Sequence, residues 1–478
     1  MLTKNDPAVI LTYLEDSSNL KGGHADKVLI PQNIEEVSSV LKEANSKKIS
    51  VTISGAGTGQ AGGRIPFGGL VLSTEKLSLI KQTRKLDKGG CVTAEAGVPI
   101  KDLKEECDRN KLFYTYDPTE QTAFVGGTVA TNASGARSFR YGPTRRYVKG
   151  MKLVLADGSI LSLNRGEIKA KGRVIEFRAE KRSYRFDLPK YKMPLTKNSA
   201  GYFAEDDMDL VDLFVGQEGT LGVIAEAEFR LPEKPKGLFS CFAFFADEVS
   251  SWDFAQHARK AGPLSIEYFD NNCLGLLREK YPNVPVGARA AIFFEDEIVE
   301  SENTVIGKWG ALLSKKGVLL DNTWVAMNEK ARGDFLEKRR YIPERMSEMA
   351  KRSGLPKVST DLAVPDNKAS EMMLFYKDNL KNSALQHFVF GHIGDSHLHV
   401  NMLPADPGAY EKSRKLQLEF VKKSIALGGT VSAEHGIGKT KTGFLKLLYG
   451  ENGVKDMFTV KKALDPNLIL GRGNIFAV

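Results

Sequence analysis

The chain has 478 residues, of which 42% are hydrophobic and 27% charged, and it carries a formal net charge of +9. These values are typical of a soluble globular protein with two or three domains, and no apolar run is long enough to span a bilayer. The N-terminus also lacks the basic start and apolar core of a signal peptide, so we expect a cytoplasmic protein, either free or peripheral at the inner membrane face.

The predicted elements begin with a strand, a helix and a second strand. The first strand covers 28–33, apolar residues recur at helical spacing from Ile34 to Leu41, and the second strand covers 49–55. It runs into the glycine-rich loop GAGTGQAGG, residues 55–63, whose backbone N–H groups can cradle a phosphate. The loop lacks the GK[ST] ending of a Walker sequence and precedes a strand, which argues against an ATPase.

Two more glycine-rich segments follow. A strand at 91–99 and a helix opened by Pro99 lead to residues 117–161, where glycine and other small residues would let a flat ligand and a diphosphate lie against the backbone. A third glycine-rich turn lies within 213–235 and leads into an alternating strand. Together these segments predict a site for a large phosphate-bearing ligand.

Residues 165–197 form the densest basic stretch. The pattern predicts a solvated hairpin or, alternatively, a surface that docks an acidic protein or an anionic membrane. No recognition-helix or RNA-binding motif is present, so we expect no nucleic-acid partner. Four scattered cysteines without a CxxC pair argue against an iron–sulfur cluster or a structural zinc site.

The composition changes at about residue 237. From there strands alternate with helices and no glycine-rich loop recurs at first, which predicts an α+β cap with a helix over 328–351. The stretch 388–403, FVFGHIGDSHLHVNML, then reads as strand, glycine-bearing turn and strand. Four of the seven histidines lie in it or directly before it: His387, His392, His397 and His399.

These histidines form a candidate metal site. On an alternating strand His397, His399 and Asn401 share one face, and a second segment, 432–441, offers Glu434 and His435. Two imidazoles and one carboxylate are the ligand set of a divalent metal that keeps an open position for substrate. From the pattern alone, histidines that only donate hydrogen bonds or face solvent are an equal alternative.

Several motifs together carry a resemblance to a known family. SGAGTGQAGG, VGGTVATNASGARSFRYGPTRRYVKGMKLVLADG, TKNSAGY and LFVGQEGTLGVI resemble the FAD-binding domain of the vanillyl-alcohol oxidase flavoprotein family. GHIGDSHLH, SAEHGIGKTK and ALDPNLILGRGNIF resemble its branch of D-lactate, glycolate and D-2-hydroxyglutarate dehydrogenases. The resemblance implies an α+β fold: a two-part PCMH-type FAD-binding domain at 1–235, a cap with the metal site at 236–440, and C-terminal helices at 441–478 that return to the FAD domain.

The resemblance also implies which residues hold FAD. The first glycine-rich loop has no histidine and no cysteine lies in any of the glycine-rich loops, so we expect the flavin to be bound non-covalently. The residues that match the family's FAD contacts are Gly55, Gly57, Thr58, Gly59, Gly126, Gly127, Asn132, Ser134, Gly135, Glu218, Gly219, Ile224 and Asn474.

For the metal, the resemblance implies His392, His399 and Glu434 as ligands of zinc, manganese or iron, and His435 as the general base. His397 stands where relatives usually have asparagine and is an extra imidazole. The implied reaction converts a D-2-hydroxy acid to the 2-oxo acid. The metal lowers the pKa of the substrate hydroxyl, His435 accepts the proton, and a hydride passes to the flavin.

Substrate contacts are implied in the same way. Arg339, in FLEKRRYIPERM, aligns with an arginine that clamps the substrate carboxylate, for which a bidentate guanidinium is suited. Asn401 aligns with a second contact. Ser359 stands where the D-2-hydroxyglutarate enzymes have a lysine, so a second substrate carboxylate would need Arg340 or Lys357 instead.

Two other classes of protein remain open at this point. One is a non-redox flavoenzyme like the alkylglycerone-phosphate synthases, and the other is a flavin-binding subunit of a larger electron-transfer complex. The spacing of the histidines and Glu434 favours the dehydrogenase. Its implied partners are a small 2-hydroxy acid, a quinone, cytochrome or electron-transfer flavoprotein as electron acceptor, and a second copy in a homodimer.

Overall fold

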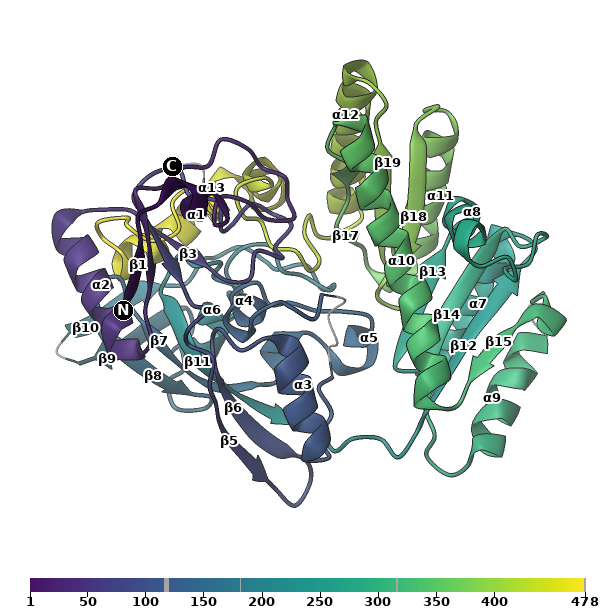
Figure 1. The fold of residues 1–478 in the computed structure, drawn as a ribbon, viewed down its shortest axis with the longest axis horizontal. Coiled ribbons are helices and arrows are strands. Elements are labelled where there is room, and N and C mark those ends of the chain that lie inside the picture. The colour runs from purple at the N-terminus through teal and green to yellow at the C-terminus, as the bar shows by residue number, and fades with distance from the viewer. Residues whose placement is uncertain (116–119, 181, 315–316, 477–478) are drawn as a thin grey trace.

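The computed structural model describes residues 1–115, 120–180, 182–314 and 317–476. Residues 117–119 of the second glycine-rich segment, residue 181 of the basic stretch and residues 477–478 of the C-terminal segment lie outside the described residues. Figure 1 shows two lobes, one that contains the strands β1 to β11 and one that contains β12 to β19. Within the described ranges, no helix combines the length and apolarity needed to cross a bilayer.

The first lobe begins with a sheet in the order β1-β2-β4-β3. Its strands are β1 (Leu2–Lys4), β2 (Lys27–Ile30), β3 (Val51–Ser54) and β4 (Leu70–Ser73), and the short helix α1 (Pro7–Leu11) lies in the β1–β2 connection. Helix α2 (Ile34–Lys47) joins the parallel strands β2 and β3, capped by the Asn33 side chain, which accepts from the Glu36 N–H. The predicted strand–helix–strand start is therefore confirmed.

A second sheet, in the order β5-β6-β11-β7-β8, is antiparallel. Its strands are β5 (Ile80–Lys85), β6 (Gly90–Glu95), β7 (Val148–Val154), β8 (Ile160–Asn164) and β11 (Val223–Leu231). Short helices connect them: α3 (Ile100–Arg109), α4 (Val125–Ala130), α5 (Ser138–Tyr141) and α6 (Leu210–Phe214). The basic stretch forms the predicted hairpin, β9 (Val174–Ala179) and β10 (Arg182–Asp187), whose Phe177, Tyr184 and Phe186 are buried.

The second lobe is built on an antiparallel sheet in the order β15-β12-β14-β13-β18-β19-β16. Its strands are β12 (Leu238–Phe245), β13 (Ser265–Phe269), β14 (Ala290–Glu297), β15 (Trp324–Ala326), β16 (Val358–Ser359), β18 (Gln386–Gly391) and β19 (His397–Leu403), with β17 (Leu362–Ala363) also paired to β19. Helices alternate with these strands along the chain, which confirms the predicted α+β fold.

Helices cover both faces of that sheet. One face packs against α8 (Asn271–Lys280) and α10 (Glu329–Ser353) through Phe242, Phe293, Phe335 and Phe388. The opposite face packs against α7 (Glu248–Ala261), α9 (Glu302–Ser314), α11 (Ala369–Lys381) and α12 (Pro407–Ala426). Helix α10 confirms the helix predicted over 328–351, and it carries Arg339 across the sheet.

The end of the chain returns to the first lobe (Figure 1). Helix α13 (Thr442–Leu464) bends at Gly450, whose φ of +69° interrupts the helical backbone, so two helical segments form as predicted. Beyond it, the Val51 N–H of β3 donates to the Ile469 carbonyl at 2.7 Å, and the Gly471 N–H donates to the Val51 carbonyl at 3.0 Å. The C-terminal segment thereby extends the first sheet beside β3.

Candidate active site

The histidine-bearing stretch folds as predicted into β18, a turn at Ile393–Asp395 and β19. Pairing of Phe390 with His399 and of Phe388 with Asn401 fixes the register of the two strands. Gly391 has a φ of +130°, and a Cβ there would lie 3.0 Å from the His399 ring, so a residue without a side chain is needed before His392. Alternation along β19 then directs His397, His399 and Asn401 to one face.

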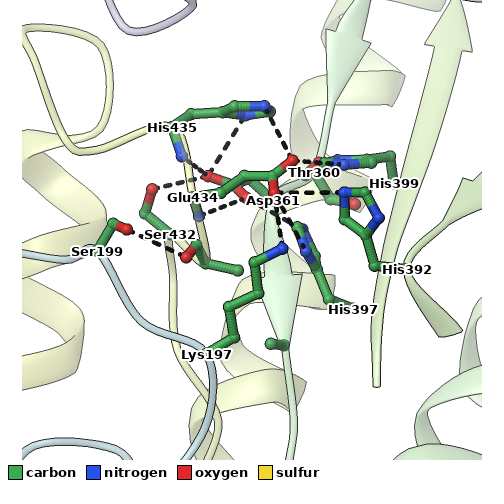
Figure 2. A network of polar contacts seen from close by, with 12 residues as sticks. Lys197, Ser199, Thr360, Asp361, His392, His397, His399, Ser432, Glu434 and His435 are labelled. Carbon is green, nitrogen blue, oxygen red and sulfur yellow. Dashed lines mark hydrogen bonds and ion pairs between the residues drawn. The ribbon is translucent and has the colours of Figure 1, made fainter. Parts of the chain in front are cut away.

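Glu434 lies at the centre of the histidine cluster (Figure 2). Its Oε2 is 3.3 Å from His392 Nε2, and its Oε1 is 3.1 Å from His399 Nε2. Possible ligand atoms of these three residues and of His397 all lie within 4.8 Å of one another. The residues predicted as metal ligands are therefore brought together from segments that are separate in the sequence.

The Nδ1 atoms of His392 and His399 are also held by hydrogen bonds. His392 Nδ1 donates to Glu267 Oε1 at 2.5 Å, and His399 Nδ1 donates to the Thr360 carbonyl at 3.1 Å. Because a carboxylate and a carbonyl only accept, each Nδ1 carries a proton, and each Nε2 is left either to bind a metal ion or, when protonated, to donate to Glu434. This is the tautomer that a metal ligand requires.

Charges in the cluster fit a cation. Although burial opposes the charged form, Glu267 and Glu434 raise the pKa of His392 to about 9, so a proton and a metal ion compete for its Nε2. Burial raises the pKa of Glu434, yet Lys197 and His392 hold it well below its usual value. His397 Nε2 lies 3.1 Å from Asp361 Oδ1 and its Nδ1 lies 3.9 Å from Glu434 Oε2, and burial lowers the pKa of His397 to about 3. The donor set therefore fits a divalent metal.

His435 lies on the other side of Glu434, with its ring stacked on that of His399 at 5.3 Å between centroids. Burial lowers its pKa to about 4, so the imidazole is neutral and can accept a proton. Asp361 fixes the surrounding loop: it accepts from the backbone N–H groups of Glu434 and His435 at 3.2 and 3.0 Å and from Lys441 Nζ at 2.7 Å.

Lys197 enters the cluster from the first lobe. Its Nζ is 2.7 Å from Glu434 Oε2 and 3.8 Å from Asp395 Oδ2, and its side chain is 6% exposed. Sequence reasoning assigned it no role, because it is the last of many cations in the basic stretch. Only its position in TKNSAGY, among the motifs that carry the resemblance, set it apart.

The predicted substrate contacts lie at the edge of the cluster. Arg339 Nη2 donates to Glu267 Oε2 at 3.0 Å, and its guanidinium lies 5.2 Å from the centre of the Phe293 ring. Asn401 accepts from Ser359 Oγ at 2.7 Å. Of the two residues expected to replace the missing lysine, Lys357 is half-buried directly before β16, two residues ahead of Ser359, and Arg340 is exposed on α10.

A cleft of about 310 Å³ runs from the first glycine-rich loop to His392, Glu434 and His435. All of the predicted FAD-binding residues line it except Asn132 and Asn474. Asn132 supports the wall, since its Oδ1 accepts from the Arg145 N–H at 3.0 Å. Asn474 joins two walls by donating to the carbonyls of Gly63 and Glu218, both at 2.9 Å.

Two charged groups shape the walls of this cleft. Glu218 is buried and accepts from the backbone N–H groups of Ile437 and Gly438 at 2.8 and 2.6 Å, which ties its turn to the loop that bears His435. Arg64, which sequence reasoning missed, lies over the first loop: a Cβ on Gly57 would be 2.1 Å from Arg64 Nη1. Its Nε is buried without a hydrogen-bond partner among the described residues.

Comparison with known proteins gives matches over nearly the whole chain. The profile of a family described as FAD linked oxidases, C-terminal domain, matches residues 235–475, and that of a FAD binding domain matches residues 25–164. A D-lactate dehydrogenase of Archaeoglobus fulgidus is 31% identical, with 94% of this chain and 90% of that protein covered.

Other relatives have similar lengths. The glycolate oxidase subunit GlcD of Bacillus subtilis is 28% identical over 98% of this chain and 92% of its own, and a D-2-hydroxyglutarate dehydrogenase of Xanthomonas citri pv. viticola is 27% identical over 99% and 94%. Among solved structures, an alkyldihydroxyacetonephosphate synthase superposes with a TM-score of 0.66 at 14% identity, covering 98% of this chain and 82% of that one. At that identity the likeness concerns the fold alone.

Proposed function

The chain belongs to the FAD-linked oxidase family, and from this premise we propose that it is an FAD-dependent dehydrogenase that oxidises a D-2-hydroxy acid to the 2-oxo acid. One observation carries the proposal. His392, Glu434 and His435 of the cluster line the same cleft as the glycine-rich loops. A hydroxyl placed at the cluster would thus lie beside whatever ligand fills the cleft.

The cleft residues would hold FAD, which supplies the redox chemistry by accepting a hydride. Gly59 and Gly127 leave their backbone open to a diphosphate, and Arg64 adds a positive charge beside Gly57 of the first loop. None of the cysteines lines the cleft in the described part of the chain, so we keep the expectation of a non-covalent flavin.

We assign His392, His399 and Glu434 as ligands of a divalent metal, with zinc and manganese favoured and iron as a third candidate. A metal there would act as a Lewis acid on the substrate hydroxyl. Lys197 would keep Glu434 ionised and in place, because its ammonium group contacts the oxygen that faces His392.

Substrate orientation and proton transfer fall to three further residues. His435, neutral and open to the cleft, would accept the hydroxyl proton. Arg339 uses one N–H on Glu267 and keeps other donors for the substrate carboxylate. Asn401, held by Ser359, would contact the substrate on the face shared with His399.

Anaerobic flavin bleaching tests the proposal. Purified protein would be titrated with matched D- and L-2-hydroxy acids, before and after removal of metal by a chelator. We expect the flavin absorbance to bleach with a D-acid, to stop bleaching after chelation, and to recover when metal returns. A yellow protein that no hydroxy acid reduces would contradict the dehydrogenase and favour the non-redox class or an electron-transfer subunit.

The flavin must then be reoxidised by a partner. We infer an external acceptor of the quinone, cytochrome or electron-transfer flavoprotein class, and the β9–β10 hairpin offers a basic docking surface for an acidic protein or an anionic membrane. Some of its charge is already neutralised, since Arg173 pairs with Asp206 and Arg182 with Asp157. A homodimer is part of the same proposal and is checked by light scattering.

A further inference from the structure

We infer that Glu267 is a positioning residue that connects the metal ligand His392 to the carboxylate-binding Arg339. The inference rests on the proposed function, because it deepens the roles assigned there to His392 and Arg339. Neither the glycine-rich loops nor the histidine motif contains this glutamate, which lies 125 residues from His392 in the sequence.

Both oxygens of Glu267 are committed. Its side chain projects from the middle of β13 and the residue is 4% exposed. Oε1 accepts from His392 Nδ1 at 2.5 Å, and Oε2 accepts from Arg339 Nη2 at 3.0 Å. One carboxylate therefore bridges the turn after β18 and the helix α10, and it does so in a buried site where each bond is strong.

Each bond has a separate consequence. The bond to His392 fixes the Nδ1–H tautomer and makes Nε2 a stronger electron-pair donor toward a metal, as carboxylate–histidine pairs do. The bond to Arg339 holds the guanidinium over the Phe293 ring and leaves its remaining N–H groups for a substrate carboxylate. Metal affinity and substrate affinity should thus change together when this residue changes.

Glutamine is the informative substitution. Both partners of Glu267 are donors, and an amide offers one accepting oxygen and one donating NH₂ group, so Glu267→Gln can satisfy His392 or Arg339 but not both. Size and burial are preserved, which separates loss of the bridge from loss of packing. We expect the variant to fold, with a thermal transition close to that of the wild type.

Glu295 provides a matched control. It lies on the adjacent strand β14, is 1% exposed, and accepts from Arg137 Nε at 2.9 Å and from Arg332 Nη2 at 3.2 Å. It resembles Glu267 in burial and in binding arginine, but none of the contacts found for it involves a histidine. Glu295→Gln should therefore leave metal affinity unchanged.

The experiment measures Zn²⁺ and Mn²⁺ affinity of the FAD-loaded proteins by competition with a chromophoric chelator. We expect Glu267→Gln to weaken metal binding by roughly 10- to 100-fold, the range seen for such partners of ligating histidines, and Glu295→Gln to match the wild type. At saturating metal, KM for the D-2-hydroxy acid should also rise in Glu267→Gln. In the double variant Glu267→Gln, Arg339→Lys, the increase in KM should be smaller than the combined increases of the two single variants.

The two proposals fail separately. If no hydroxy acid bleaches the flavin but only Glu267→Gln loses metal affinity, the dehydrogenase is excluded and the positioning role toward His392 stands. If Glu267→Gln binds metal as tightly as the wild type, or if Glu295→Gln weakens binding equally, the inference is overturned. A wild-type protein that binds neither metal overturns it as well, whatever the bleaching shows.

Discussion

The glycine-lined cleft and the histidine cluster meet at Glu434, yet they are built by different means. The cleft is lined by many glycines, and a Cβ added to Gly57 or Gly126 would clash with a neighbouring side chain. The cluster is made of side-chain atoms from β19, from the turn before it and from the 432–441 loop. Ser134 joins the two regions by donating to Glu434 Oε2 at 3.3 Å.

This difference predicts different weaknesses. A site made of backbone is lost when a side chain is added, whereas a site made of side chains is lost when one ligand atom is replaced. Substitutions in one region should therefore leave the ligand of the other region in place. Glu218 lines the cleft and also hydrogen-bonds the 432–441 loop, so a substitution there, as at Ser134, should affect both regions.

Glu434→Gln should have the largest effect. The amide removes the negative charge between His392, His399 and Lys197, so we expect loss of bound metal and a fall in kcat of at least roughly 10³-fold. The visible spectrum should still show stoichiometric flavin. Metal analysis and absorbance on the same sample check both statements, and a variant that keeps its metal but loses FAD would contradict the separation.

Gly57→Ala should act on the other region. Gly57 has a φ of +82°, and its added Cβ would meet Arg64 Nη1. The conformation alone costs a non-glycine residue roughly 1–2 kcal/mol, enough to weaken FAD binding about tenfold, with metal content unchanged. Gly172→Ala is the control, because Gly172 also has a positive φ (+58°) and a Cβ there has no atom of the described residues within 4 Å, but Gly172 does not line the cleft. Flavin release on dilution measures both, and equal losses would argue against the steric explanation.

Glu218 should make stability depend on pH. Burial, opposed by the Ile437 and Gly438 N–H groups, raises the pKa of Glu218 from 4.5 to about 7. The folded state then holds the proton more tightly, so the free energy of unfolding should fall as pH rises from about 4.5 through about 7, by at most about 3 kcal/mol.

Chemical unfolding of flavin-free protein at pH 5 to 8 checks this dependence against Glu218→Gln, which does not titrate. The free energy of unfolding of the wild type, relative to that of Glu218→Gln, should fall as the pH rises. A difference that stays constant across this range would show that another group carries the pH dependence.

Ser359→Ala should have the smallest effect. It removes the donor to Asn401 Oδ1 and with it about 1 kcal/mol of hydrogen bonding. We expect KM for the hydroxy acid to rise a few-fold, while kcat, metal and flavin stay near wild type. Steady-state kinetics would decide it, and an unchanged KM would remove Asn401 from the substrate contacts.

The sequence predicted elements with a regular period more completely than contacts between distant segments. Alternation placed His397, His399 and Asn401 on one face of a strand, and helical spacing located α2 and α10. Periodicity carries no information about partners far apart in the chain, and so it missed Lys197, which lies 237 residues from Glu434. It also gave no sign that Arg339 binds Glu267, because a helix pattern does not tell which strand its side chains meet.

The return of the C-terminal segment to β3 has a consequence for how the protein is made. Val51 emerges from the ribosome long before Ile469 and Gly471, whose backbone groups pair with it. Until then one side of β3 is an open strand edge, a surface on which nascent chains aggregate. Flavin capture should therefore follow synthesis of residues 469–471, and proteins truncated before residue 469 should depend on chaperones and accumulate without colour.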